Sequence, residues 1–262
     1  MDLELHGKTA IVTGSTGGIG LQIARALAVE GAHVVISGRD SSKVDQAVAS
    51  ITDKGDNAIG VVSDITRPEG ASALLAAAGQ VDILINNLGI YETRDFGDIT
   101  DDDWHRLFDI NVVSGARLAQ AVFPGMIERN DGRIIFVASI SGVSVLGNMI
   151  HYSASKAAQL AVARGMAELT KGTRVTVNSV LPGPTRADGI ETFMRRQAAD
   201  PTDPLDKIEA EFFRKSRPTS LIQRMIEPDE VASLVTYLAS SRSSATNGAA
   251  LRVEGGLITT IL

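Results

Sequence analysis

The sequence contains no cysteine, which excludes disulfide bonds, thiolate metal sites and thiol catalysis. Histidine is scarce as well, and the four histidines lack the spacing of metal ligands, so we expect no protein metal site. No apolar run approaches the roughly 18 residues that a membrane-spanning helix requires, and we expect no membrane span. A lack of disulfides is typical of cytoplasmic proteins, so we expect a cytoplasmic location.

Positive charge is also limited. The net charge of −6 argues against binding to nucleic acid or to an anionic membrane surface. The first residues, MDLELHGK, begin acidic and lack the basic region of a signal peptide. With 44% hydrophobic and 21% charged residues, the composition is that of a globular protein, and we expect one domain over residues 1–262.

Short β-branched apolar runs alternate with longer amphipathic stretches along most of the chain. Nearly continuous apolar strands are buried on both faces, as in a parallel sheet that helices cover. The pattern therefore predicts an α/β fold of the Rossmann type, with a doubly wound parallel sheet in a three-layer α/β/α arrangement. The predicted strands are 9–14, 33–38, 59–64, 81–87, 132–139 and 173–183, and the first predicted helices are 20–32 and 41–55.

Residues 186–224 differ from the rest of the chain. This segment carries many charges of both signs, is broken by prolines and is longer than a simple connection requires. One interpretation is a solvated helical excursion, and the other is a substrate lid beside the strand ends. Its bulky apolar residues would either line a substrate pocket or fasten the lid to the body; they are Phe193, Met194, Phe212 and Phe213.

A glycine cluster, TGSTGGIG at 13–20, lies between the first predicted strand and the first predicted helix. Glycines there permit a tight turn and let backbone amides approach a pyrophosphate, which the start of the helix also attracts. The spacing T-G-x-x-x-G-x-G leaves a wider loop than the dinucleotide fingerprint G-x-G-x-x-G. We predict a nucleotide-binding loop with contacts from Gly14, Ser15, Thr16, Gly18 and Ile19.

The end of the second predicted strand indicates which nucleotide binds. An NAD site usually places an acid here to bond the ribose 2′-hydroxyl, but this sequence has Gly38 followed by Arg39. A guanidinium suits a 2′-phosphate through charge-assisted hydrogen bonds. The residues therefore favour NADP(H), with NAD(H) as the alternative if Arg39 is only a solvated loop residue.

The stretch HYSASKAA at 151–158 places Tyr152 and Lys156 four residues apart, which is one turn of a helix. A phenol has an ordinary pKa of about 10, and a nearby ammonium favours the phenolate. Such a pair would make the tyrosine useful as an acid or base near neutral pH. Taken alone, the spacing is also compatible with two unrelated helix-surface residues.

Together with the fold, these motifs resemble the classical short-chain dehydrogenase/reductase family over nearly the whole chain, including its 3-oxoacyl-acyl-carrier-protein reductases. The glycine loop matches the family's T-G-x-x-x-G-x-G, and Tyr152 to Lys156 matches its Y-x-x-x-K. The other matching residues are Asn86-Asn87-Leu88-Gly89 for N-N-A-G, Asn111 and Ser139 for the other two members of the catalytic tetrad, and Pro182-Gly183 after the sixth strand.

The resemblance implies a role for each member of the tetrad. Tyr152 would exchange a proton with the substrate oxygen, and Lys156 would lower the pKa of that tyrosine and bond the nicotinamide ribose. Ser139 would hold the substrate carbonyl or hydroxyl against Tyr152. Asn111 would hold a water that connects Lys156 to a proton relay.

The resemblance also implies cofactor contacts, although each residue could instead have a purely structural role. They are Asp64 and Ile65 at the adenine ring, Asn87 and Gly89 at the adenosine ribose, and Pro182, Gly183 and Thr185 on the nicotinamide side. Two residues depart from the family pattern. Leu88 replaces an alanine beside the cofactor loop. Ala187 falls where a threonine commonly bonds the carboxamide, a role for which Thr185 is a possible substitute.

Several aromatic residues receive structural interpretations. His151 diverges by about 100° from Tyr152 on a helix, so we expect it at the pocket wall or surface. Trp104 and Phe108, at helical spacing with Leu107, predict a packed face.

The implied function is an oxidoreductase that interconverts a carbonyl and a secondary alcohol with NADP(H), acting on a small-molecule substrate. The alternatives are an NAD-preferring alcohol dehydrogenase and a non-catalytic nucleotide-binding scaffold or redox sensor, because folds are reused without their chemistry. β-Ketoacyl thioesters, sugars and polyols, steroids and small ketones are all candidate substrates. We also expect a homo-oligomer, a tetramer or dimer, built on helices within 104–126 and 153–170, with the apolar segment 252–262 as a buried interface.

Overall fold

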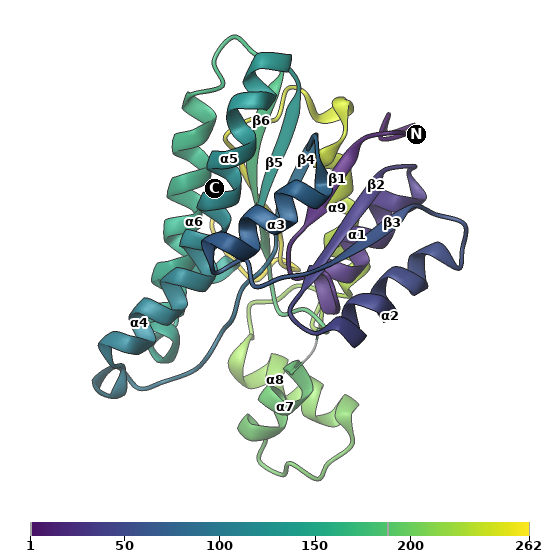
Figure 1. Cartoon of the computed structure of the whole chain (residues 1–262). Coiled ribbons are helices and arrows are strands. Elements are labelled where there is room, and N and C mark those ends of the chain that lie inside the picture. Colours follow the sequence, from purple (N-terminus) through teal and green to yellow (C-terminus); the bar gives the residue numbers. More distant parts are fainter. Residues whose placement is uncertain (1, 188, 262) are drawn as a thin grey trace.

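The protein, described here by a computed structural model over residues 2–187 and 189–261, contains a seven-stranded parallel sheet. The strand order is β3-β2-β1-β4-β5-β6-β7, with helices on both faces (Figure 1). This confirms the predicted Rossmann-type fold. The strands are β1 (Thr9–Val12), β2 (His33–Gly38), β3 (Ala58–Val62), β4 (Ile83–Asn86), β5 (Gly132–Val137), β6 (Val175–Pro182) and β7 (Ala250–Val253).

Nine α-helices occur within the described residues. They are α1 (Gly18–Val29), α2 (Ser41–Thr52), α3 (Pro68–Ala78), α4 (Asp101–Phe108), α5 (Ser114–Arg129), α6 (Ile150–Glu168), α7 (Ile190–Gln197), α8 (Leu205–Ser216) and α9 (Pro228–Ala239). A π-helical turn, Asp109–Val113, joins α4 to α5. Short 3₁₀ turns occupy Phe96–Asp98, Ile140–Gly142, Gly147–Met149 and Ser241–Ser243.

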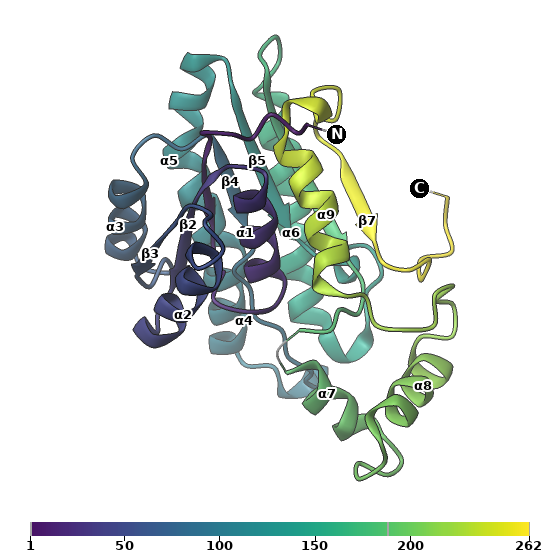
Figure 2. The same cartoon turned by 90° about the vertical axis from the view of Figure 1, so that its right-hand side faces the viewer.

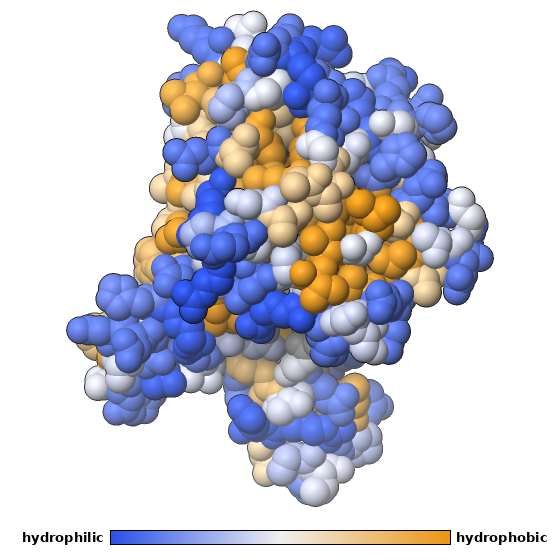
Figure 3. Space-filling view, viewed as in Figure 1, coloured by the Kyte–Doolittle hydropathy of each residue, from blue (hydrophilic) through white to orange (hydrophobic). Residues whose placement is uncertain are grey.

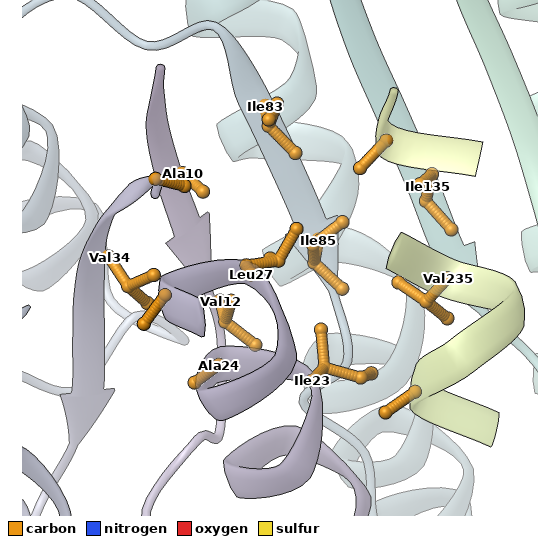
Figure 4. Close-up of a cluster of buried hydrophobic side chains, with 14 of the residues drawn as sticks. Ala10, Val12, Ile23, Ala24, Leu27, Val34, Ile83, Ile85, Ile135 and Val235 are labelled. Atoms are coloured by element: carbon orange, nitrogen blue, oxygen red, sulfur yellow. The ribbon is translucent and has the colours of Figure 1, made fainter. Parts of the chain in front are cut away.

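Most strands of the central sheet contribute to two separate hydrophobic cores, because successive side chains point to opposite faces, whereas β7 contributes to only one of them. On one face, Val12 and Ile85 pack with α1, α2 and α9, as Figure 4 shows around Ile23, Leu27 and Val235. On the other face, Ile11 and Leu84 pack with α3, α5 and α6. The alternation explains why these strands are apolar at nearly every position.

The strand order reverses at β1 and β4, which are neighbours in the sheet. The connections that leave them lead to opposite sides, so a crevice opens at the carboxyl ends of the strands. The glycine loop, 13–17, leaves β1 at this crevice, and the segment from Asn87 to Ile99 leaves β4 beside it. The fold therefore brings the predicted cofactor loop to the position where nucleotides bind in such sheets.

Helices α7 and α8 project beyond the three layers, below the carboxyl ends of the strands (Figures 1 and 2). They have a small core of their own, formed by Met194, Ile208, Phe212, Phe213 and Met225. The predicted excursion over 186–224 is therefore helical and is held together by apolar contacts that are separate from the two main cores.

Two edge strands, β7 and β3, differ from what the sequence predicts. Strand β7 was not predicted, since only four residues pair with β6 and none is fully buried. Edge strand β3 leaves Ile59 and Val62 about half exposed, at 50% and 51%. Figure 3 shows apolar side chains gathered on this face beside β3.

Candidate active site

A cavity of about 400 Å³ lies at the carboxyl ends of the strands and extends under α7 and α8. Three of the four predicted catalytic residues, Ser139, Tyr152 and Lys156, line it. The predicted cofactor residues that also line it are Ile19, Asn87, Gly89, Pro182, Gly183 and Thr185. The structure therefore brings residues from five separate segments to one place.

Ser139 reaches the cavity because it begins the 3₁₀ turn that follows β5. Its side chain caps this turn by accepting a hydrogen bond from the Ser141 N–H at 3.1 Å. The Oγ of Ser139 is also close enough to Tyr152 to lower the pKa of that phenol. Ser139 and Tyr152 therefore lie next to each other at the cavity.

Tyr152 is protonated at neutral pH in this structure. Burial raises the pKa of its phenol to about 12, which outweighs the lowering by Ser139. This direction is opposite to the one that the resemblance implies for the effect of Lys156. The Nζ of Lys156 lies 5.8 Å from the centroid of the Tyr152 ring, and burial lowers the pKa of Lys156 itself to about 7. The causes of the shift in the Tyr152 pKa are burial, Ser139 and Tyr91, and the charge of Lys156 is not among them.

Lys156 is held by two polar atoms on its own side of the cavity. Its Nζ donates to the Val137 carbonyl at 3.1 Å and to Oε1 of Gln159 at 2.9 Å. The Lys156 side chain is almost wholly buried, and no carboxylate among the described residues contacts it. This arrangement explains the low pKa of Lys156, because two neutral oxygens offset only part of the free-energy cost of removing an ammonium from water.

Asn111 lies behind Lys156, in the π-helical turn between α4 and α5. Its side chain donates to the Ile90 carbonyl at 3.0 Å and to Ser155 Oγ at 2.9 Å, and it accepts from the Ile90 N–H at 2.8 Å. The Asn111 carbonyl accepts a hydrogen bond from Nε2 of Gln159. The structure thus joins Asn111 to Lys156 through the Gln159 side chain, whereas the resemblance implies that Asn111 holds a water that connects Lys156 to a proton relay.

The glycine loop is shaped by two residues with left-handed backbone angles, Gly14 at φ 61° and Gly18 at φ 52°. Asn87 braces this loop, because its Nδ2 donates to the carbonyls of Thr13 at 2.9 Å and Gly14 at 3.1 Å. Ser15 is fully buried, and its hydroxyl joins the Val12 carbonyl to the Ser37 N–H. Both side chains therefore have structural roles, an alternative that the sequence left open for Asn87 but not for Ser15, and Asn87 in addition lines the cavity.

At the end of β2, Arg39 is exposed and forms no salt bridge with any described residue. The charge of Arg39 acts on Asp64, whose pKa is lowered mainly by a hydrogen bond from Thr66 and also by Arg39. Ile65 is buried in the core beneath α3 and α5. A contact from Ile65 to an adenine ring would therefore come from its backbone.

The side of the cavity that is predicted to hold the nicotinamide is formed by the turn after β6. A Cβ on Gly183 would lie 2.8 Å from Cα of Glu254, so only glycine fits against the chain after β7. Thr185 Oγ1 donates to the Gly183 carbonyl at 2.9 Å, which leaves its oxygen free to accept a hydrogen bond. Ala187 lies next to Gly18, at the glycine loop.

The sequence left two roles open for the bulky apolar residues of the lid: lining a substrate pocket or fastening the lid to the body. The four residues divide between pocket lining and buried packing. Phe193 and Phe212 line the cavity, whereas Met194 and Phe213 are buried between α7 and α8. His151 is fully buried and contacts Glu92 at 2.8 Å, so it is neither a surface residue nor part of the cavity wall.

Three residues of the site carry no motif that would have revealed them. Tyr91 packs edge-on to Tyr152, with ring centroids 6.4 Å apart. Gln159 contacts Lys156, and Arg217 enters the cavity from the end of α8. Each belongs to a loop or helix face whose position depends on tertiary packing, so spacing along the chain gives no signal.

Residues 2–187 and 189–261 contain neither a candidate metal-binding cluster nor a helix that could span a membrane. No group of three or more histidine, aspartate or glutamate side chains is arranged to hold a metal ion. Over the same residues, no helix has the length and apolar character needed to cross a membrane.

Known proteins match this chain over its whole length. A family model described as short chain dehydrogenase matches residues 8–198. The uncharacterized oxidoreductase YvaG of Bacillus subtilis (strain 168) is 46% identical, over 100% of both chains. The 3-oxoacyl-acyl-carrier-protein reductase FabG of Vibrio cholerae is 34% identical, over 97% of this chain and 99% of the relative. The structure of L-sorbose reductase from Gluconobacter frateurii, complexed with NADPH and L-sorbose, matches with a TM-score of 0.93 and 30% identity over 100% of both chains.

Proposed function

This chain belongs to the short-chain dehydrogenase family, and we propose that it is an NADP(H)-dependent oxidoreductase that interconverts a carbonyl and a secondary alcohol. The observation that carries the proposal is the convergence of Ser139, Tyr152 and Lys156 on one cavity beside the glycine loop. A scaffold that only binds a nucleotide has no physical need for this arrangement.

A nicotinamide dinucleotide fits the residues at this edge of the sheet. The left-handed Gly14 and Gly18 keep the loop free of side chains, and a Cβ on Gly89 would come within 3.3 Å of Lys156 Nζ. These features support contacts of the backbone with a pyrophosphate and of Lys156 with a ribose. Arg39, exposed and without a salt-bridge partner among the described residues, supports NADP(H) over NAD(H). When bound, the cofactor supplies or accepts the hydride.

The protein's own contribution is to hold the substrate oxygen and to move a proton. Ser139 Oγ bonds that oxygen and orients it toward Tyr152. In the reducing direction the Tyr152 phenol donates its proton to the oxygen as the alcohol forms, and the high pKa of the phenol keeps that proton available at neutral pH. Lys156, protonated in a substantial fraction at pH 7, then stabilises the phenolate that remains.

The substitution Tyr152→Phe tests this mechanism. It removes the proton donor while keeping the ring, so we expect turnover with any reducible carbonyl to fall by about 10²-fold or more. Tyr237→Phe is the matched control, because Tyr237 lies on α9, away from the cavity. Binding of NADPH should persist in both variants. Unchanged turnover in Tyr152→Phe would rule out the proposed role.

We further propose that the protein acts in the cytoplasm as a homo-oligomer, a dimer or tetramer. The proposed interface uses helices within 104–126 and 153–170, where Val113 and Leu169 are exposed apolar residues.

A further inference from the structure

Arg217 lies in the same cavity as Tyr152, at the end formed by the lid. It follows α8, and its guanidinium stacks on the Phe212 ring, 5.3 Å from the ring centroid. Its Nη1 donates to the Ser216 carbonyl at 2.7 Å. A guanidinium has five N–H donors, so most of them remain for a ligand in the cavity.

Among the arginines of the lid, the segment 186–224, Arg217 is the one that is partly buried and has no acidic partner among the described residues. Burial lowers its pKa, and it forms no salt bridge with any residue that the structure describes. The half-buried Arg186 pairs with Glu209, and the half-buried Arg195 pairs with Glu191. Partial desolvation of an unpaired cation is unfavourable, and a bound anion would offset it.

The charge of the cavity has one sign. Among the described residues that line it, the charged side chains are Lys156 and Arg217, with no aspartate or glutamate. This occurs in a chain with a net charge of −6. Lys156 is already held by Val137 and Gln159 at the catalytic end, so Arg217 is the cation available at the other end.

We propose that Arg217 binds a carboxylate on the substrate, so that the substrates are carbonyl compounds bearing a carboxylate and the corresponding hydroxy acids. A guanidinium matches a carboxylate through two parallel hydrogen bonds, and Phe212 holds it in place for that contact. The inference rests on the proposed function, since it names the substrate class of the same site.

The test compares carboxylates with their neutral methyl esters. The probes are 2-oxobutanoate, 4-oxopentanoate and 4-acetylbenzoate, which place the carboxylate at three distances from the carbonyl. Binding to the protein–NADPH complex is followed by nicotinamide fluorescence, and reduction is followed by loss of NADPH absorbance. The variants are Arg217→Gln and Arg217→Lys, with Arg214→Gln as the control because Arg214 is exposed on α8.

At least one acid should bind the wild type tighter than its ester by about tenfold or more, which is the scale of a charge-assisted hydrogen bond. Arg217→Gln should lose this preference, Arg217→Lys should keep part of it, and Arg214→Gln should match the wild type. The inference is overturned if every acid binds no tighter than its ester, if the preference survives in Arg217→Gln, or if that variant loses NADPH binding instead. A binding preference without any reduction would count against the proposed function and not against the carboxylate site.

A second, independent observation concerns Gln159, one turn after Lys156 on α6. Gln159 is 1% exposed, and its amide makes two contacts within the site. Its Oε1 accepts from Lys156 Nζ, and its Nε2 donates to the Asn111 carbonyl. The side chain thus occupies the space between the lysine and the π-helical turn. A primary amide can donate and accept hydrogen bonds at once, but it is a poor carrier of protons.

We infer that Gln159 is a positioning residue that fixes the Lys156 ammonium by a direct bridge to Asn111, in the place where the resemblance implies a water. The titratable Tyr152 ring lies 5.8 Å from Lys156 Nζ, and no carboxylate among the described residues affects the pKa of this lysine. The bridge therefore controls both the direction in which Nζ points and how readily it holds its proton.

Replacing the Gln159 amide by an acid or by an apolar side chain should shift the titration of Lys156 in opposite directions. Gln159→Glu places a carboxylate beside Nζ and should raise the pKa of Lys156 by about one unit or more, whereas Gln159→Leu should lower it. The readouts are the pH dependence of thermal stability between pH 6 and 9 and the pH profile of kcat. Gln120→Glu, exposed on α5, is the matched control. A purely structural Gln159 would leave both profiles where they are in the wild type, and that result would overturn the inference.

Discussion

At the scale of single residues, the buried Lys156 lowers the stability of the folded protein near neutral pH. Its side chain is 4% exposed and has only neutral oxygens for partners, so its folded-state pKa of about 7 lies below its ordinary value of 10.5. The unfolded chain therefore binds more protons than the folded protein between these pH values. Stability should rise with pH across this window, by up to about 1.4 kcal/mol per pH unit from this group alone.

The substitution Lys156→Met removes this titration. The variant should melt a few degrees higher than the wild type at pH 7, because a buried ammonium is replaced by an apolar chain of similar length. The difference should shrink as the pH rises toward 10.5 and beyond, because the unfolded chain then loses the proton that the folded protein has already released. Melting curves from pH 6 to 10 provide the measurement, and a variant less stable than the wild type at pH 7 would contradict this account.

Arg39 carries the predicted choice between NADPH and NADH. The 2′-phosphate is the only difference between these two molecules, so a titration of each isolates this residue. We expect Arg39→Ser to weaken NADPH binding by about tenfold or more and to leave NADH binding nearly unchanged. Equal losses for both cofactors would mean that Arg39 supports the fold of the loop.

A motif can indicate both the type and the place of a site residue. Ser139, Tyr152 and Lys156, which match the motifs of the family, lie in one cavity, and their catalytic roles remain predictions. The direction of the pKa of Tyr152 was not predictable, because burial of the phenol depends on Tyr91 and on the lid. Gln159 and Arg217 were not identified, since nothing in their local sequence distinguishes them from ordinary helix residues.

At the scale of elements, long apolar strands were predictable and short exposed ones were not. β5 and β6 are buried at every position, which gives the continuous apolar pattern, whereas β7 is exposed at every second residue. The π-helical turn Asp109–Val113 lies inside a helical sequence pattern. No residue type in it distinguishes a π-helix from an α-helix, so this turn could not be predicted from the sequence. Its effect is local, because it places the Asn111 carbonyl within reach of Gln159.

The lid offers an element-level prediction. Phe213 is 1% exposed and joins α7 to α8 without lining the cavity. Phe213→Ala should loosen these helices and raise the KM for a carbonyl substrate while NADPH binding is kept, because the predicted cofactor residues lie at the strand ends. Leu221→Ala is the control, since Leu221 is 83% exposed. An unchanged KM would mean that the packing of the lid does not affect substrate binding.

At the scale of the whole molecule, the fold was predictable because the evidence for it is spread over the entire chain. Strand–helix alternation fixes a parallel sheet, and the crevice then follows from the reversal of strand order at β1 and β4. Surface properties are harder to predict, because exposure is decided by tertiary packing. The half-exposed Ile59 and Val62 on edge strand β3 belong to a run that the sequence alone marks as buried.

Assembly is the whole-molecule property that a hydrodynamic measurement can settle. We expect sedimentation velocity to give a dimer or tetramer, because helices α5 and α6 are proposed to form an apolar interface. Val113→Arg, which places a charge on an apolar position that is 41% exposed, should shift the distribution toward smaller species. A wild-type monomer at micromolar concentration would contradict the proposed interface.

The central claim is hydride transfer between NADPH and a carbonyl, with Tyr152 as the proton donor. The most direct test is to incubate the protein with NADPH deuterated at C4 of the nicotinamide and a panel of ketones, and to analyse the alcohols by mass spectrometry. We predict deuterium at the carbinol carbon of at least one product, and very little of that product with Tyr152→Phe. A panel that yields no deuterated alcohol, or one that yields as much with Tyr152→Phe as with the wild type, would contradict the claim.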